Sequence, residues 1–171
     1  MRQKTLWITQ TAALLALLII LQLATRSAGQ LVTGSCVNAV LALIAGLSSS
    51  LTVAVLSPFL AFALGVGPKL LPIVPAIAVG NAALAALICL FARKSLSPAR
   101  RAAATVVAAA GKFALLYLLV VQLLCRVLTL NEKQIAAFSA MFSWPQLVTA
   151  LIGAAVAMCV APVIQKALGR E

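Results

Sequence analysis

Long apolar runs, separated by short polar stretches, occupy most of the chain. An α-helix rises about 1.5 Å per residue, so about 20 apolar residues cross the hydrocarbon core of a bilayer. The runs in this sequence have about that length or slightly less. They predict a single-domain, all-α integral membrane bundle of six transmembrane helices, at residues 5–25, 31–47, 51–66, 75–91, 102–127 and 144–168.

Serines and prolines mark the predicted ends of these helices. Ser48-Ser49-Ser50 separates the second helix from the third, although one broken element over both is an alternative. Pro68, Pro72 and Pro75 predict a turn before the fourth helix, because proline lacks an amide donor and restricts the residue before it. Residues 131–142 have a mixed pattern that predicts a short interfacial helix.

Composition narrows the class of protein. Of the 171 residues, 64% are hydrophobic and 9% are charged, and the mean hydropathy is +1.17. Soluble domains carry roughly 25% charged residues, so this surface suits a membrane rather than water. The 13 lysines and arginines against 2 acids give a net charge of +11. Between apolar spans such residues fix membrane orientation, so we expect contact with lipid and no nucleic-acid partner.

The distribution of lysine and arginine predicts how the six spans are oriented. Basic residues are enriched in the cytoplasmic loops of membrane proteins. Six spans put both termini on one side, which we expect to be cytoplasmic because it carries the larger basic set: Arg2, Lys4, Arg93, Lys94, Arg100, Arg101, Lys166 and Arg170. The other side carries Arg26, Lys69, Arg126 and Lys133, beside Glu132.

Enzyme and metal chemistry have no candidate residues in the sequence. The chain has no histidine, and its four cysteines stand far apart in apolar runs without a C-x-x-C pair. We therefore expect no metal site and no disulfide framework. General acid–base catalysis has no intramembrane acid to use, and there is no P-loop pattern for ATP. We expect neither catalytic residues nor a cofactor.

Five side-chain amides, one from each of five predicted helices, fall at similar depth in the outer half of the bilayer, by the helix rise. A lone amide in a membrane helix often serves as a hydrogen bond between helices. Five together predict a water-accessible pocket for a polar solute. Trp144 either lines this pocket or belongs to the aromatic belt at the membrane surface. The five amides are Gln22, Asn38, Asn81, Gln122 and Gln146.

Lys112 falls near the middle of the bilayer on the fifth predicted helix. Insertion scales put the cost of a lysine there at about 2.5–3.5 kcal/mol, and neither acid of the chain is placed to pair with it. An ideal helix turns about 100° per residue, which puts Gln122 and Arg126 on the same face and predicts one wall of an anion site. The alternative is a structural lysine, bonded to carbonyls of a kinked neighbour or extended toward the cytoplasm.

The first predicted helix contains a ridge of small residues, Ala12-x-x-x-Ala16, of the type that allows helices to approach closely. With six short spans and a polar outer half, the chain resembles the substrate-binding S components of energy-coupling factor (ECF) vitamin transporters. The resemblance covers the whole chain in architecture, and its specific sequence part is the alanine motif.

The resemblance implies a function in the bacterial plasma membrane. An S component captures a vitamin or related micronutrient from outside and delivers it through a transmembrane coupling subunit powered by two cytosolic ATPases. Ala12 and Ala16 match the motif that docks on the coupling subunit. The positive, acid-free pocket predicts an anionic substrate with a carboxylate or phosphate: lipoate, pantothenate, biotin, niacin or a folate-like compound. Cobalamin, thiamine and riboflavin stay open.

Two other functions are compatible with the sequence. One is a scaffold membrane protein resembling the rod-shape protein MreD, in which the amides only join helices and no ligand binds. The other is a self-contained secondary carrier. The lack of intramembrane acids argues against proton or cation coupling, which usually needs them.

Overall fold

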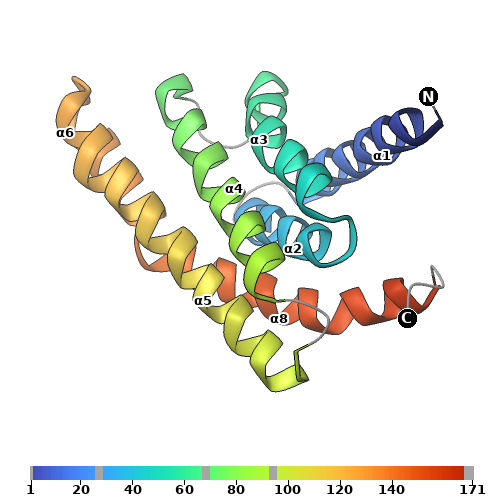
Figure 1. The fold of residues 1–171 in the computed structure, drawn as a ribbon. Helices are drawn as coiled ribbons and strands as arrows, with labels where there is room; N and C mark the ends of the chain where they lie inside the picture. Colours follow the sequence, from blue (N-terminus) through green and yellow to red (C-terminus); the bar gives the residue numbers. More distant parts are fainter. Residues whose placement is uncertain (1, 26–28, 67–69, 93–95, 168–171) are drawn as a thin grey trace.

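The computed structural model describes residues 2–25, 29–66, 70–92 and 96–167, and the elements within those ranges are all helical (Figure 1). The predicted all-α class is therefore confirmed. The short elements are the 3-10 turn η1 (Leu71–Ile73), the π-helix η2 (Tyr117–Leu124), α6 (Cys125–Val127) and α7 (Glu132–Met141). The long helices are α1 (Arg2–Ala24), α2 (Gly29–Ile44), α3 (Leu47–Ala63), α4 (Val74–Phe91), α5 (Pro98–Leu116) and α8 (Trp144–Ala167).

Four helical stretches are long and apolar enough to cross a membrane: Trp7–Ala24, Leu71–Phe91, Pro98–Val127 and Glu132–Ala167. The helices α2 and α3 are shorter, with 16 and 17 residues. At about 1.5 Å per residue they extend for about 24–26 Å, somewhat less than a hydrocarbon core of about 30 Å. By length and composition, the chain is suited to a membrane.

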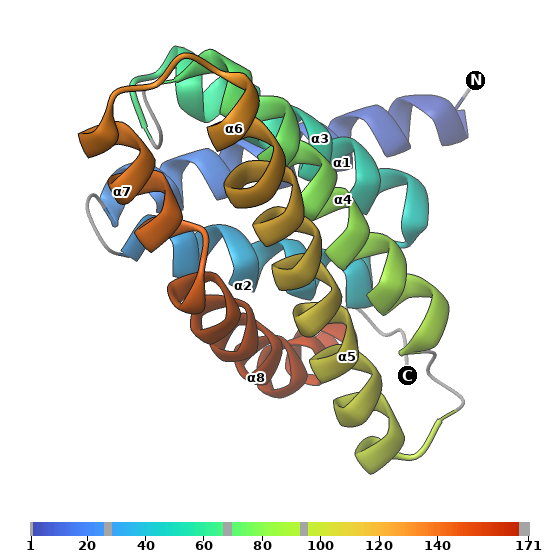
Figure 2. The same ribbon diagram turned by 90° about the vertical axis from the view of Figure 1, so that its left-hand side faces the viewer.

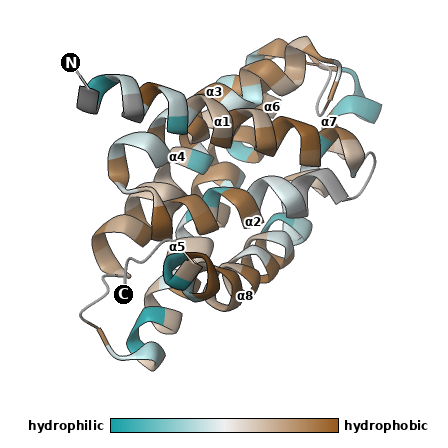
Figure 3. Cartoon of the chain, turned by 90° about the vertical axis from the view of Figure 1, so that its right-hand side faces the viewer, coloured by the Kyte–Doolittle hydropathy of each residue, from teal (hydrophilic) through white to brown (hydrophobic). Residues whose placement is uncertain are grey.

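The surface of the bundle supports a membrane environment. Large apolar side chains stand exposed on several helices, with Val107 65%, Leu118 58% and Val163 68% accessible. Figure 3 shows apolar residues along most of the helices, with hydrophilic residues at the N-terminal end of α1, on α7 and in the first turns of α5. In water these faces would lose the free energy gained by burying apolar area, about 25 cal/mol per Å². Lipid removes that penalty.

Both ends of the described chain lie on one side of the bundle. In Figures 1 and 2 the start of α1 and the end of α8 lie away from α6 and α7. Several basic residues of the topology prediction fall outside the described residues: Arg26, Lys69, Arg93, Lys94 and Arg170.

The break between α2 and α3 comes earlier than the serine run predicts. Gly46 has a φ of 81°, a left-handed conformation that suits glycine, and it is the N-cap of α3. Ser48, Ser49 and Ser50 belong to the first turn of α3 instead. Serine hydroxyls bond readily to nearby carbonyls, and the Ser50 hydroxyl oxygen lies 2.6 Å from the Gly46 carbonyl, within hydrogen-bonding distance. The structure thus contains two separate helices here.

The short helix predicted at residues 131–142 is present as α7. Asn131 caps it: the side chain accepts from the Gln134 amide at 2.8 Å, and the Gln134 side chain accepts from the Asn131 amide at 3.2 Å. This reciprocal arrangement is a capping box, which satisfies amides at the start of a helix.

The helix α2 lies at the centre of the bundle and packs against α1, α3, α4 and α8. Its second half contributes Ala39 and Ala42 to a core made mostly of small residues. We call this set the alanine-rich core: Ala39, Ala42, Ala54, Leu84, Ala85, Ile88, Ala92, Ala108 and Ala157. Small side chains let the helix backbones come close, and the core contains no charged side chain.

The last carbonyls of α2 lack amide donors within their own helix, although the Ala45 amide, just beyond its end, donates to the Leu41 carbonyl at 2.8 Å. Side chains from three other helices supply further donors. The hydroxyl of Ser50, from α3, lies 2.9 Å from the Leu41 carbonyl and shares its single proton between that carbonyl and the Gly46 carbonyl. The thiol of Cys89, from α4, donates to the Ala42 carbonyl at 3.1 Å. From α8, Gln165 Nε2 donates to the Leu43 carbonyl at 2.8 Å. These polar side chains therefore hold helices together.

The helix α1 is the least enclosed of the long helices that could cross a membrane. Of the stretch Trp7–Ala24, 11% of the residues are buried. The indole of Trp7 donates to the Ser48 hydroxyl at 3.1 Å, and the Thr11 hydroxyl donates to the Ser49 hydroxyl at 3.2 Å. These bonds attach α1 to the start of α3 and leave most of its surface uncovered.

Candidate functional site: a polar pocket around Lys112

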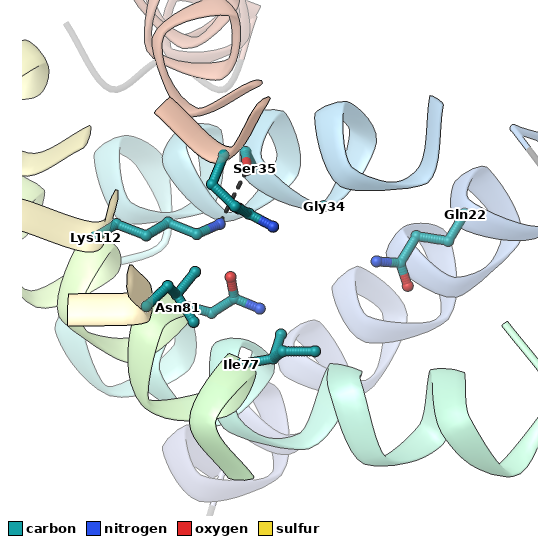
Figure 4. Close-up of a pocket in the computed structure, with 8 residues that line it drawn as sticks. Gln22, Gly34, Ser35, Ile77, Asn81 and Lys112 are labelled. Carbon is teal, nitrogen blue, oxygen red and sulfur yellow. Dashed lines mark hydrogen bonds between the residues drawn. The ribbon is translucent and has the colours of Figure 1, made fainter. Parts of the chain in front are cut away.

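A polar cavity of about 50 Å³ lies between the last turns of α1 and α5, the first turns of α2 and α8, and the first half of α4. Figure 4 shows side chains from four of these helices extending toward it. We call its lining the polar pocket: Gln22 from α1, Gly34 and Ser35 from α2, Ile77 and Asn81 from α4, Lys112 and Leu116 from α5, and Gln146 from α8.

The ammonium group of Lys112 is buried in this pocket. The side chain is 4% exposed, and Nζ donates to the Ser35 hydroxyl at 2.9 Å (Figure 4). An ammonium has three N–H groups, and the other two have no acceptor among the described residues. Of the two acids in the chain, Glu132 is exposed on α7 and Glu171 lies outside the described residues. The described pocket therefore holds a positive charge without a counter-charge.

Three side-chain amides surround this charge without partners of their own. Gln22 Oε1 is buried and has no hydrogen-bond partner in the described structure. The side chains of Asn81 and Gln146, 7% and 3% exposed, make no hydrogen bond to any described residue. A buried polar group without a partner costs about 1–3 kcal/mol. The pocket is thus chemically unsatisfied, and a polar ligand or water can supply what it lacks.

Two glycines allow the helices to close around the pocket. A Cβ atom on Gly153 of α8 would lie 2.8 Å from the backbone of Ser35 and Cys36 on α2. A Cβ atom on Gly80 of α4 would lie 2.7 Å from Leu116 Cγ on α5. Real side chains do not approach this closely, so glycine is required for these crossings as they stand. The first crossing fixes Ser35, which in turn holds Lys112.

Asn38 lies beside the pocket and does not line it. The side chain is 1% exposed, and its Nδ2 donates to the Gly34 carbonyl, one turn earlier on α2, at 2.9 Å. Its Oδ1 is buried and has no partner in the described structure. Asn38 was predicted to bind substrate, and the structure places it one turn after Gly34, outside the lining of the cavity.

Gln122 and Arg126 form a separate cluster. Gln122 Nε2 donates to the Tyr117 hydroxyl at 3.1 Å, and Arg126 Nη2 donates to Gln122 Oε1 at 2.7 Å. Arg126 is exposed, and neither residue lines the polar pocket. The predicted wall of Lys112, Gln122 and Arg126 does not form.

The π-helix η2 explains why that prediction failed. It covers Tyr117–Leu124, between Lys112 and Arg126. A π-helix bonds residue i to i+5, so it turns through a smaller angle per residue than the 100° of an α-helix. Side chains beyond it therefore point in a different direction from that of an ideal helix. Tyr117 and Gln122, five residues apart, meet across one such turn.

The remaining predicted residues are exposed. Trp144 is 69% accessible at the start of α8 and does not line the pocket, whereas Gln146, two residues later, does. On α1, Ala12 and Ala16 are both exposed. A partner can therefore reach the small-residue ridge without unfolding the subunit.

Sequence reasoning did not select Ser35, the hydrogen-bond partner of Lys112. The signal was weak: Ser35 stands three residues before Asn38, on roughly the same helix face, in a sequence where serine is common. Ile77 and Leu116 complete the lining and carry no polar signal that could have identified them.

A second hollow, of about 320 Å³, lies at the other end of α2, between the ends of α2 and α4 and the start of α3. Its lining is apolar apart from backbone atoms and Cys89, whose thiol already bonds to the Ala42 carbonyl. Among the described residues no group of three histidines, cysteines or acids is placed to hold a metal ion.

Comparisons with known proteins identify no relative: no family model, no curated protein and no solved structure matches the chain. Its assignment to a class of protein therefore depends on the helical fold, the apolar helices and the polar pocket.

Proposed function

We propose that the protein is the substrate-binding S component of an ECF-type importer and captures a small anionic micronutrient in the polar pocket. One observation carries the proposal. A buried ammonium and three unpartnered amides line one cavity, and no described acid neutralises the charge. Polar groups that only joined helices would bond to one another or to the backbone. Groups left without partners are available to a ligand.

The proposal places all six long helices across the bacterial plasma membrane, with both termini in the cytoplasm. The larger basic set lies at the proposed cytoplasmic side, as the positive-inside rule requires. The shortness of α2 and α3 is compatible with crossing, because local thinning of the bilayer accommodates a few Å of mismatch at modest cost. The polar pocket then faces the exterior.

The size of the pocket indicates which part of the substrate it holds. Ligand pockets for whole small molecules usually measure about 300–1,000 Å³. At about 50 Å³, the cavity suits the charged group of a vitamin rather than the whole molecule. The rest of the substrate needs space beside Gln22, where displacement of the sparsely buried α1 would provide it.

The energy source in this proposal is external to the chain. The sequence has no P-loop, so ATP hydrolysis belongs to two partner ATPases, linked through a transmembrane coupling subunit. Ala12 and Ala16, exposed on α1, are the residues that we assign to docking on that subunit. No enzymatic step and no cofactor are proposed for this chain.

A thermal-shift screen of the purified protein against vitamins tests the proposal. A ligand at 100 times its Kd adds about 2.7 kcal/mol of stability, which corresponds to a rise in Tm of roughly 5–10 °C for a chain of this size. We expect such a rise with one anionic vitamin. If no vitamin stabilises the protein, the scaffold function gains support. Transport of the bound vitamin by the chain alone, in vesicles without ATPases, would instead indicate a secondary carrier.

A further inference from the structure

We infer that the group held beside Lys112 is a single carboxylate, on a substrate of net charge −1. This inference rests on the proposed function and narrows the substrate class of the same pocket. It excludes phosphate esters and dicarboxylates, which a positive pocket alone would permit.

Charge balance favours one carboxylate. The pocket lining contains one cation, Lys112, and no acid. Arg126 is exposed and bonded to Gln122, away from the lining. Arg101 lies eleven residues before Lys112, about 16 Å along α5. A second negative charge in the pocket would therefore lack a cation.

Phosphate esters and dicarboxylates carry more negative charge than a single carboxylate. A phosphate monoester carries about −1.5 to −2 charges at neutral pH, and a dicarboxylate carries two. Either would leave a net negative charge in a poorly hydrated site, where transfer from water is expensive. One carboxylate against one ammonium leaves the pocket neutral.

The available donors also match a carboxylate. Its two oxygens accept about four hydrogen bonds. Two N–H groups of the Lys112 ammonium are free among the described residues, and the NH₂ groups of Asn81 and Gln146 lie in the same lining. The three oxygens of a phosphate would need more donors than this set provides. The small volume of the cavity, about 50 Å³, favours the smaller group as well.

Gln22 adds a further donor to the pocket. Its Oε1 is buried and has no partner in the described structure. Figure 4 shows the amide nitrogen of Gln22 directed toward the pocket, from the side opposite Lys112, with the oxygen turned away from it. The NH₂ group of Gln22 can therefore donate to a carboxylate oxygen from that side.

The test compares matched compounds by calorimetry on the purified full chain. The single-carboxylate probes are biotin, pantothenate, nicotinate and lipoate. Folate supplies two carboxylates, pyridoxal 5′-phosphate and thiamine phosphate supply phosphate, and thiamine and riboflavin lack both groups. For each carboxylate that binds, the primary amide at the same position serves as the neutral control.

We expect the strongest ligand to be a single carboxylate, and its neutral amide to bind about 10-fold to 100-fold more weakly, since a hydrogen-bonded charge is lost. Strongest binding by a phosphate, a dicarboxylate or an uncharged vitamin would overturn this inference and leave the proposed function standing. Absence of binding by every probe would overturn both.

The contribution of Gln22 is tested separately with Gln22→Leu, using Gln10→Leu, an exposed position on the same helix, as the control. Loss of one hydrogen bond should weaken the preferred ligand about 3-fold to 10-fold in Gln22→Leu alone. Unchanged affinity for the preferred ligand in Gln22→Leu would remove Gln22 from the groups that hold the carboxylate.

Discussion

The two ends of α2 show polar side chains in opposite states. At its C-terminal end, Ser50, Cys89 and Gln165 reach in from three helices and donate to its last carbonyls. Near its N-terminal end, Ser35 bonds to Lys112, but Gln22, Asn81 and Gln146 around that pair have no described partner. Both regions are buried in the same bundle.

The difference separates structural polar groups from groups available for binding. Burial makes an unpaired polar group expensive, so a region that serves stability alone tends to pair its groups. The C-terminal end of α2 follows that rule. The polar pocket departs from it at several atoms within one cavity, as binding sites do. Ser57 Oγ and Arg101 Nε also lack partners, but neither lines the polar pocket.

Among substitutions that test the contrast between the two ends of α2, we expect Gly153→Ala to have the largest effect. The added Cβ meets the backbone of α2 at 2.8 Å, and backbone cannot move aside locally. We expect the loss of about 1–3 kcal/mol that overpacking causes, together with weaker ligand binding because Ser35 shifts. Thermal unfolding and calorimetry measure the two effects.

Gly111→Ala is the matched control for that substitution. Its Cβ meets the end of the Leu87 side chain at 2.9 Å, which can change rotamer. Alanine also raises helix propensity by about 1 kcal/mol over glycine, so the net change in stability should be small. Equal stability of the two variants would contradict the assigned role of the Gly153 crossing.

Next in size is the difference between Asn81→Leu and Gln122→Leu. Both amides fall at the same depth by helix rise, but only Asn81 lines the polar pocket. We expect Asn81→Leu to weaken ligand binding about 3-fold to 10-fold, the value of one hydrogen bond, and Gln122→Leu to leave it unchanged. Calorimetry with the vitamin found by thermal shift decides between them. An equal loss in both would place Gln122 in the site.

Asn81 and Gln122 also show how much of the site can be predicted from the sequence. Depth along a helix is set by residue number, so Asn81 and Gln146 were expected in the outer half of the bilayer and Lys112 near its middle, and the structure brings the three into one cavity. Direction around a helix depends on the turn per residue. The π-helix between Lys112 and Arg126 changes the angle turned per residue, and the sequence of that segment, YLLVVQLL, contains no residue that predicts a π-helix. Arg126 was therefore assigned to the wrong face.

Other features depended on tertiary contacts that one sequence does not display. Ser35 is one of many serines, and its role follows from a crossing that needs Gly153, far along the chain. The end of α2 was expected at the serine run, which carries turn-forming residues, whereas Gly46 supplies the left-handed conformation that ends it. The all-α class needed only the apolar pattern and was predicted correctly.

A smaller effect, on stability alone, is expected for Gln165→Leu at the other end of α2. It removes the bond to the Leu43 carbonyl, and hydrogen bonds between membrane helices contribute about 0.6 kcal/mol on average and up to about 1.7. Thermal unfolding should register that loss, while the Kd for the vitamin stays at the wild-type value. A weaker Kd with an unchanged Tm would assign ligand binding, rather than stability, to the C-terminal end of α2.

The smallest effect on the isolated subunit is expected for Ala12→Leu combined with Ala16→Leu. Both positions are exposed, so stability and ligand binding should be unchanged. Assembly with the proposed coupling subunit should fail, because the larger side chains prevent close helix approach. Co-purification measures assembly, with Ala24→Leu, also exposed on α1, as the control. Normal assembly of the double variant would remove the docking role.

The most direct measurement is the affinity of the bound vitamin for wild-type protein and for Lys112→Met, with Lys133→Met, an exposed lysine on α7, as the charge-matched control. A binding role predicts that Lys112→Met folds with equal or higher stability without ligand, since a buried unpaired charge is removed, and binds about 10-fold to 100-fold more weakly. Lys133→Met should bind as the wild type does. Wild-type affinity in Lys112→Met, with a lower Tm, would show that the lysine is structural and contradict the account.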